Sequence, residues 1–302
     1  MPSPALLLAL ILITPTILLS GAEKFTIATW NLENYLDQPT TKRRSKPIAA
    51  KNNIHAALLE LRADVIALEE MGSTNALSEL RDALKRSGLD YPHWEHVHAR
   101  DDEIHLAVLS RFPIAARRPH TNESFLIDGR RFFVKRGFAE VDIRIGTNYH
   151  FTLLAAHLKS KLQVAGADES SLRLNEARLL RRRVDAILSA KAESNLVVLG
   201  DFNDTEDSPP LKLILGRDSG RGLLDTCPRE LGVLASPPNG KDNAWTYHYD
   251  RQKSFSRFDY ILLSSGMKRE WQQEGTRIFS RNDWRIASDH RPLVATFSAE
   301  DR

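Results

Sequence analysis

Acidic, amide and histidine side chains recur in this sequence at the points where apolar runs end. They occur in "TWNLEN" (Asn31), "ALEEM" (Glu69, Glu70), "AAHLKS" (His157), "VVLGDFND" (Asp201, Asn203), "RFDYILLS" (Asp259) and "ASDHRP" (Asp289, His290). A single residue of this kind after a strand is usually a turn or cap residue. As a set, these residues are the groups that metal binding and proton transfer require, because ionisable groups near a core need partners or a function.

The oxygen donors of this set favour a hard divalent cation. Asp, Glu and Asn supply oxygen ligands, the histidines lack the paired spacing of a zinc site, and the only cysteine is Cys227. We therefore expect Mg²⁺ as the cofactor, with Mn²⁺ as a substitute. Hydrolysis of a phosphodiester bond needs such a cation, an activated water and a stabilised leaving oxygen, so the residue types suit that reaction.

Apolar runs rich in β-branched residues alternate with helical patterns and predict the elements that carry these residues. Helices are expected from about Ser45 (Ser cap, Pro47 in the first turn), from 74 to 87 (ended by Gly88) and from 171 to 190. Many strands and few helices favour stacked sheets with helices outside. Strands are expected in "FTIATW", "DVIALEE", "HLAVLSRF", "RGFAEVDIRI", "HFTLLAAHL", "NLVVLGDF", "RFDYILLS" and "PLVATFS".

Composition and the N-terminal segment indicate an exported globular protein. The 302 residues carry a formal net charge of +3, which allows a phosphate-bearing partner without requiring one. An apolar block from Ala5 ends at Ser20-Gly21-Ala22, which predicts a signal peptide of residues 1–22; a membrane anchor is the rival interpretation. We expect one domain over 23–302, no membrane span after cleavage, and a secreted or periplasmic location.

Five stretches give the chain a resemblance to a known family. "TWNLEN", "DVIALEEM", "GDFND", "RFDYILLS" and "SDHRPL" lie in this order within residues 24–298. In this the chain resembles the endonuclease/exonuclease/phosphatase superfamily, which has the deoxyribonuclease-I-like fold. The resemblance implies an α/β four-layer sandwich of two packed mixed β-sheets flanked by helices, with the active site on one rim.

The resemblance also implies a metal site. Glu70 would be the main ligand, assisted by Asn31 and Asp289 or by waters bound to them. The family usually has Gln where Glu69 stands, so Glu69 is an alternative ligand. Only one of these two glutamates can face the site, because side chains alternate along a strand.

The catalytic roles are implied in the same way. Asp201 would orient or deprotonate the attacking water, and Asn203 would hold the phosphate. His290 would face the scissile phosphate, paired with Asp259, which keeps it protonated. His157 would act as an acid near the leaving group. A buried Asp–His pair that only braces two strands is the structural alternative for Asp259 and His290.

The substrate is less well defined by the sequence than the reaction. Arg130 and Arg131, interleaved with aromatic residues in "GRRFFVKRG", and Lys159 are candidate substrate contacts. They favour nucleic acid, so a nuclease acting on DNA, and on RNA as a second substrate, is the first choice. A phosphodiesterase or phosphatase acting on a lipid head group or a small phosphate ester is the alternative, because fold and motif do not determine the substrate. No protein partner is indicated.

Overall fold

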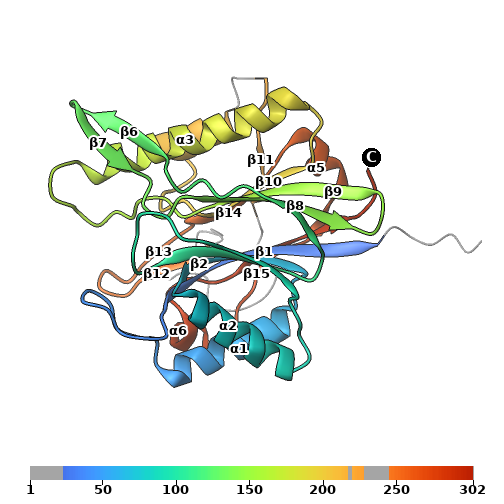
Figure 1. Ribbon diagram of the computed structural model, residues 1–302, viewed down its shortest axis with the longest axis horizontal. Helices are drawn as coiled ribbons and strands as arrows, with labels where there is room; N and C mark the ends of the chain where they lie inside the picture. The colour runs from blue at the N-terminus through green and yellow to red at the C-terminus, as the bar shows by residue number, and fades with distance from the viewer. Residues whose placement is uncertain (1–22, 217–219, 228–244, 302) are drawn as a thin grey trace, which may run out of the picture.

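Two six-stranded mixed sheets lie face to face in the computed structural model, which describes residues 23–216, 220–227 and 245–301 (Figure 1). The expected signal peptide, residues 1–22, lies outside the described residues. The first sheet has the order β15 (Trp271–Ile278), β16 (Leu293–Ser298), β1 (Lys24–Tyr35), β2 (Val65–Met71), β4 (His105–Ser110) and β3 (His93–Val97). The second has the order β11 (Leu224–Asp225), β14 (Asp259–Leu263), β10 (Leu196–Asp201), β9 (Tyr149–Ala156), β8 (Phe138–Ile145) and β5 (Ile114–Arg117).

Helices cover the outer face of each sheet. The first sheet is covered by α1 (Ile48–Leu61), α2 (Thr74–Arg86) and the short α6 (Trp284–Ala287); α3 (Glu169–Ala190), α4 (Pro209–Leu215) and α5 (Ser265–Glu270) lie beside the second (Figure 1). Two hairpins stand apart from the sheets: β6 (Ser124–Ile127) with β7 (Arg130–Phe133), and β12 (Tyr247–Tyr249) with β13 (Ser254–Ser256). No helix in the described ranges is long and apolar enough to cross a membrane.

Strand β1 shows why the core forms in layers. Phe25 and Ile27 pack into the cluster between the two sheets, whereas Ala28 and Trp30 pack into the cluster that includes residues of α1 and α2. A strand covered on both faces carries apolar side chains on both, as β1 does with Phe25, Ile27, Ala28 and Trp30. A third cluster joins the second sheet to α3 and α4. The expected four-layer α/β sandwich is therefore confirmed.

Helix starts agree with the predicted positions within a few residues. The Ser73 hydroxyl accepts hydrogen bonds from the backbone N–H groups of Asn75 and Ala76 at the start of α2, and the Asp168 carboxylate accepts one at the start of α3. The expectation that Ser45 caps the first helix was wrong. The helix begins after Pro47, which has extended backbone and provides no side-chain cap.

Candidate active site

Both sheets deliver polar side chains to one rim. Asn31 lies near the end of β1, opposite Glu69 of β2, and Asp201 ends β10, opposite Asp259 of β14. Asn31 Nδ2 donates a hydrogen bond of 3.0 Å to Asp201 Oδ2, so the two sheets are joined at this rim by side chains from the motifs "TWNLEN" and "GDFND".

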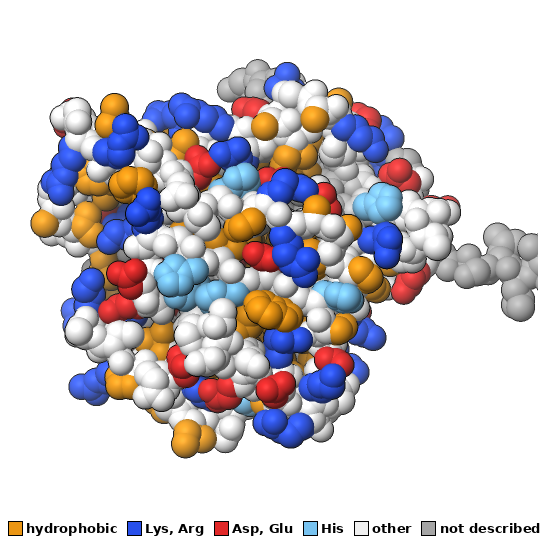
Figure 2. Space-filling view, viewed as in Figure 1, with side chains coloured by type: hydrophobic (Ala, Val, Ile, Leu, Met, Phe, Trp, Pro, Cys, Tyr) orange, Lys and Arg blue, Asp and Glu red, His pale blue; other side chains and the backbone are white. Residues whose placement is uncertain are grey.

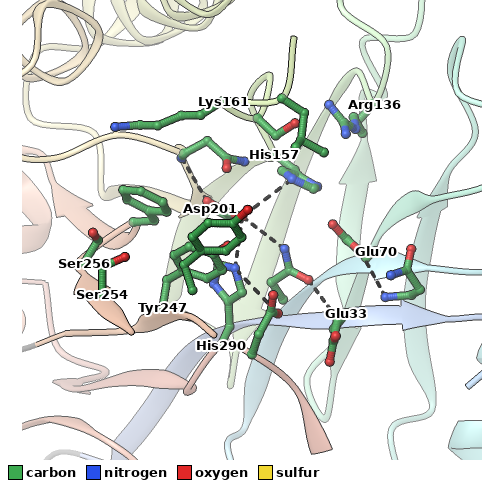
Figure 3. A pocket seen from close by; sticks show the side chains of 18 of the residues that line it. Glu33, Glu70, Arg136, His157, Lys161, Asp201, Tyr247, Ser254, Ser256 and His290 are labelled. Carbon is green, nitrogen blue, oxygen red and sulfur yellow. Dashed lines mark hydrogen bonds and ion pairs between the residues drawn. The ribbon is translucent and has the colours of Figure 1, made fainter. Parts of the chain in front are cut away.

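Asp201 lies at the centre of the cluster (Figure 3). Besides Asn31, two histidines face the same carboxylate oxygen: His157 Nε2 lies 3.5 Å and His290 Nε2 lies 3.7 Å from Asp201 Oδ2. The second oxygen, Oδ1, accepts a 2.8 Å hydrogen bond from the backbone N–H of Asn203. Asn203 Nδ2 donates to the Leu158 carbonyl at 3.0 Å, which uses one of its two amide hydrogens.

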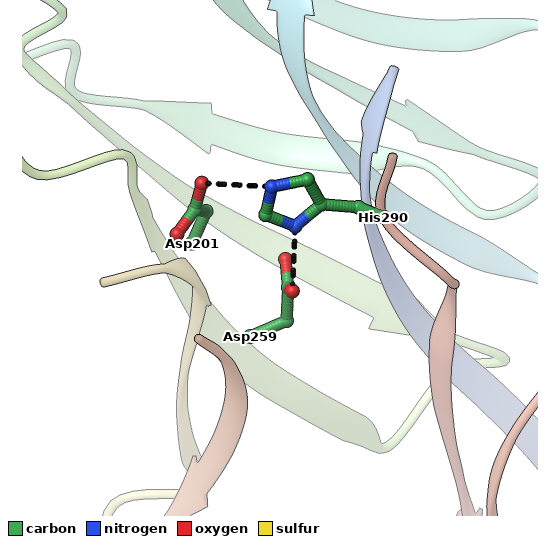
Figure 4. Close-up of side chains that lie close together, drawn as sticks. All are labelled: Asp201, Asp259 and His290. Atoms are coloured by element: carbon green, nitrogen blue, oxygen red, sulfur yellow. Dashed lines mark hydrogen bonds and ion pairs between the residues drawn. The ribbon is translucent and has the colours of Figure 1, made fainter. Parts of the chain in front are cut away.

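His290 is held between two carboxylates (Figure 4). Its Nδ1 donates to Asp259 Oδ2 at 2.8 Å, while Nε2 faces Asp201. Burial opposes a positive charge on His290, but the charges of Asp259 and Asp201 and the hydrogen bond to Asp259 outweigh it and raise the pKa well above the usual value. The imidazole is therefore a cation at neutral pH.

Two further titrating groups of the cluster are shifted in ways that bear on catalysis. Burial raises the pKa of Asp201 to about 7, with the Asp259 charge adding to it and His290 opposing it. Such a carboxylate is suited to accept a proton near neutral pH. Burial, followed by the charges of Arg136 and His290, lowers the pKa of His157 well below its usual value. This shift favours the neutral form of the imidazole, and the acid role expected for His157 stays a prediction.

The backbone at this rim is unusual in the places where the motifs lie. Gly200 has φ of 132°, and a Cβ there would lie 2.0 Å from the Ala156 carbonyl oxygen, so "GDFND" requires its glycine. Glu70 and Asn203 adopt the left-handed region, with φ of 58° and 55°. Arg62, at the end of α1, has the same left-handed backbone, so this conformation alone does not identify a functional site; at Glu70 and Asn203 the surrounding fold holds it in place.

The two adjacent glutamates have different environments. Glu69 is fully buried, its Oε1 accepts a hydrogen bond of 2.7 Å from the Thr29 hydroxyl, and burial, followed by the Asp259 charge, raises its pKa well above normal. Glu70 lines the pocket, and its Oε2 accepts the Asn34 N–H at 2.9 Å and faces Arg43 at 3.7 Å. Within the described residues its Oε1 accepts no hydrogen bond, so Glu70 is the carboxylate free to bind a cation.

The donors fit a divalent cation at two neighbouring places. Oxygen or nitrogen atoms of Asp201, Asp259 and His290 lie within 4.8 Å of one another, a spacing that could hold a metal only if His290 lost its proton. The other place is around Glu70. There, burial and then the negative charges of Glu33 and Glu70 raise the pKa of Asp289 to about 7, although 38% of the Asp289 side chain is exposed. Carboxylates this close repel one another, and a bound cation removes that repulsion.

Asp289 and His290 both serve the pocket because they precede the last strand. They follow α6, β16 begins only at Leu293, and both side chains line the pocket. The prediction that both lie in the loop before the strand is confirmed. Residues on the strand itself would point to opposite faces.

These groups line a single pocket of about 550 Å³, large enough for a small organic ligand. Three of its lining residues are cationic and come from basic stretches of the sequence: Arg43, Arg136 and Lys161. Arg43 follows "TWNLEN" in the charged loop "TKRRSKP", and Lys161 follows His157 by four residues. The charge of these three residues can be read from the sequence, but the direction of their side chains cannot.

The three predicted substrate contacts lie outside the pocket lining. Lys159 is buried, and its Nζ donates to the Ser160 and Leu162 carbonyls at 2.7 and 2.6 Å, so it shapes the loop beside the pocket. Arg130 and Arg131 lie on the hairpin β6–β7, exposed. Lys and Arg side chains gather on this face over β6, β7 and α3 (Figure 2).

Solved structures with the same fold come from proteins of several named activities. One is sphingomyelinase C from Streptomyces griseocarneus, with 19% identity, 91% of this chain and 100% of that chain covered, and a TM-score of 0.61. The catalytic domain of human nocturnin has 15% identity, coverage of 92% and 95%, and a TM-score of 0.62. An endonuclease/exonuclease/phosphatase from Bacteroides vulgatus has 15% identity, coverage of 92% and 100%, and a TM-score of 0.64. At these identities the likeness concerns the fold.

The sequence itself carries the assignment to a family. No curated protein matches it significantly. A model of the endonuclease/exonuclease/phosphatase family matches residues 28–290, a range that contains each motif from Asn31 to His290. The chain therefore belongs to the endonuclease/exonuclease/phosphatase family, the enzymes of which hydrolyse phosphoester bonds.

Proposed function

We propose that this protein is a Mg²⁺-dependent nuclease that hydrolyses phosphodiester bonds in DNA, and in RNA as a second substrate. The observation that carries the proposal is that one pocket combines the Asp201–His290 cluster with Arg43, Arg136 and Lys161. A proton acceptor, an imidazolium and three further cations in one cavity suit a substrate that keeps a negative charge throughout the reaction. Mn²⁺ would substitute for Mg²⁺.

The residues of the chain would divide the reaction as follows. Glu70, assisted by Asn31 and Asp289, would hold the cation, which when bound neutralises charge on a non-bridging phosphate oxygen. Asp201, with its raised pKa, would accept the proton of the attacking water.

Two donors would hold the phosphate during this step. His290, kept charged by Asp259, would donate a hydrogen bond from Nε2 to a phosphate oxygen. Asn203 would donate its remaining amide hydrogen. Both groups are fixed by the fold before the substrate arrives, which is what stabilisation of a transition state requires.

The surroundings of the pocket support nucleic acid over a lipid surface. Arg130 and Arg131 have no carboxylate partner within the described ranges, so they are available for phosphates beyond the pocket. The turn of the β12–β13 hairpin beside the pocket is the charged sequence Asp250-Arg251-Gln252-Lys253, which suits water better than an apolar membrane interior.

A lipid head group is the alternative substrate, favoured by the fold shared with a sphingomyelinase C. A substrate panel distinguishes the two. Residues 23–302 with Mg²⁺ should nick plasmid DNA and should stop when the ion is chelated. If the protein spares DNA and RNA but cleaves sphingomyelin or a small phosphate ester, the nuclease proposal is wrong.

Export is part of the same proposal and rests on the N-terminal sequence. We propose that residues 1–22 direct the chain out of the cytoplasm and that the mature enzyme is secreted or periplasmic. N-terminal sequencing of the protein recovered from outside the cytoplasm should find Glu23 as the first residue.

A further inference from the structure

One wall of the pocket is a stack of aromatic rings that the proposed reaction does not use. Tyr247 and Tyr249 are two positions apart on β12 and so share one face of the strand. Their ring centroids lie 6.5 Å apart with planes at 22°, and the Phe258 ring lies 5.0 Å from Tyr247 at 18°. All three residues line the pocket.

This wall is fixed next to the reacting groups. The Tyr247 ring lies 4.7 Å from the His290 ring, and the two residues also form an isolated backbone bridge. The His248 N–H donates to the Asp289 carbonyl at 3.0 Å, and the Arg291 N–H donates to the Thr246 carbonyl at 2.7 Å. The hairpin is therefore held against the loop that carries Asp289 and His290. A ligand on the stack would lie next to the residues proposed to hold the phosphate.

Polar side chains accompany the rings. Gln252, Ser254 and Ser256 line the pocket, and Figure 3 shows the two serines with Tyr247 on the side opposite Glu70 and Arg136. Within the described part of the chain, none of these three side chains forms a hydrogen bond to another residue. An amide and two hydroxyl groups offer donors and acceptors, the groups that the edge of a planar heterocycle requires.

We propose that this wall is a subsite for the nucleobase attached to the reacting phosphate. The base stacks on the outer ring, Tyr249, and its edge bonds to Gln252 and the two serines. The inference rests on the proposed nuclease function, which it deepens by giving the enzyme a contact with the base.

The position of Lys161 argues against a quaternary ammonium head group as the occupant. Aromatic rings also bind such cations. However, Lys161 Nζ already lies 5.1 Å from the centroid of the Phe258 ring, so a cationic head group at that end of the stack would meet a like charge. At the Tyr249 end, the binding experiment below distinguishes a cationic head group from a neutral base.

Binding of two ligands that differ only in the base tests the subsite. Adenosine monophosphate and ribose 5-phosphate are titrated calorimetrically into the wild-type protein in chelator, so that neither is hydrolysed. Stacking of one base predicts that adenosine monophosphate binds roughly 10-fold more tightly. Tyr249→Leu should remove this preference, and Tyr249→Phe should keep it. Trp94→Leu, which removes a partly exposed aromatic residue outside the pocket, is the matched control and should keep the preference.

The outcomes separate this inference from the proposed function. Equal binding of the two ligands, or a preference that survives Tyr249→Leu, overturns the base subsite, whether or not the same protein nicks plasmid. A base preference in a protein that cleaves neither DNA nor RNA overturns the nuclease instead. Phosphocholine binding more tightly than both ligands, and lost in Tyr249→Leu, overturns the base subsite in favour of a head-group subsite.

Discussion

His290 Nδ1 lies 2.8 Å from Asp259 Oδ2, and both side chains are buried. The other nitrogen of the ring faces Asp201 across 3.7 Å. Asp259 thus sets the orientation and charge of the imidazole, and Asp201 lies next to its Nε2 atom. An Asp–His pair that only braced two strands would have no need of a second carboxylate or of an opening onto a pocket.

His290→Gln and Asp259→Asn test this assignment. Each should lower kcat/KM by about 10²- to 10⁴-fold, because the charged donor to the phosphate is lost or is no longer held protonated. Thermal midpoints should fall as well, because each replacement removes one partner of a buried ion pair, so turnover per folded molecule is the quantity that decides. The measurements are steady-state hydrolysis of a phosphodiester and thermal unfolding of the same samples.

The bracing alternative makes the reverse prediction for turnover in these two variants. It predicts a fall in the thermal midpoint with turnover per folded molecule retained. That result would remove His290 and Asp259 from the catalytic machinery.

The adjacent glutamates provide a matched pair for the metal site. Glu70→Gln should weaken activation by Mg²⁺ at least 10- to 100-fold, the range that loss of a supporting group alone produces at metal sites. Glu69→Gln should preserve activation, because Glu69 is fully buried, does not line the pocket and already accepts a hydrogen bond from Thr29. Activity against Mg²⁺ concentration is the measurement. Normal activation in Glu70→Gln together with its loss in Glu69→Gln would exchange their roles.

Acid sensitivity should arise partly from His105. The His105 side chain is buried, and the rings of His96 and His98 lie 4.9 and 4.6 Å from its ring. Burial, followed by the charges of these two histidines, lowers the pKa of His105 to about 4. The negative charges of Asp101 and Asp102 oppose this shift. An unfolded histidine titrates near 6.5, so the unfolded chain binds the extra proton between pH 6.5 and 4. Stability from His105 is present above this window and is lost as the pH falls through it.

His105→Phe tests the origin of this acid sensitivity. The free energy of unfolding of the variant should fall less steeply between pH 6.5 and 4, by up to about 3 kcal/mol over the whole window. Denaturant unfolding at several pH values measures it, with His150→Gln at an exposed position as the control. Equal pH slopes for His105→Phe and wild type would assign the sensitivity to other groups.

Salt dependence tests the hairpin β6–β7. If Arg130 and Arg131 each contact one phosphate, replacing either with Ala should reduce the slope of log affinity against log salt by about 0.9 on duplex DNA. Lys268→Ala, an exposed cation on α5, should leave the slope unchanged. Unchanged slopes for the hairpin variants would restrict substrate contacts to the pocket.

Much of the fold could be predicted because its central strands are long and covered on both sides. Each of the eight expected strands is present, and the missed ones, such as β3 and β5, lie at sheet edges. Edge strands are short and half-exposed, so tertiary pairing decides them more than their own composition. The three short helices α4, α5 and α6 were missed for a different reason. Segments of four to seven residues are too short to show a helical period in the sequence.

The predicted metal and catalytic residues come together at the pocket, with Asp259 behind His290, because strand ends share a rim, a consequence of topology that the motif order already implied. The three predicted substrate contacts do not line it. The sequence did not indicate which loop side chains point into the pocket. Lys161 points into the pocket while Lys159, two residues earlier, turns back to bond its own loop. The left-handed backbone of Glu70 likewise could not be predicted, because the fold imposes it and glutamate does not favour it.

A crystal of the protein grown with Mn²⁺ and inorganic phosphate would show whether one cation and one phosphate occupy this pocket together. The anomalous signal of Mn²⁺ should lie against the Glu70 carboxylate, with the phosphate within hydrogen-bonding distance of Asn203 and His290. Mn²⁺ bound elsewhere with Glu70 unliganded, or a phosphate remote from Asn203 and His290, would rule out this pocket as the site of hydrolysis.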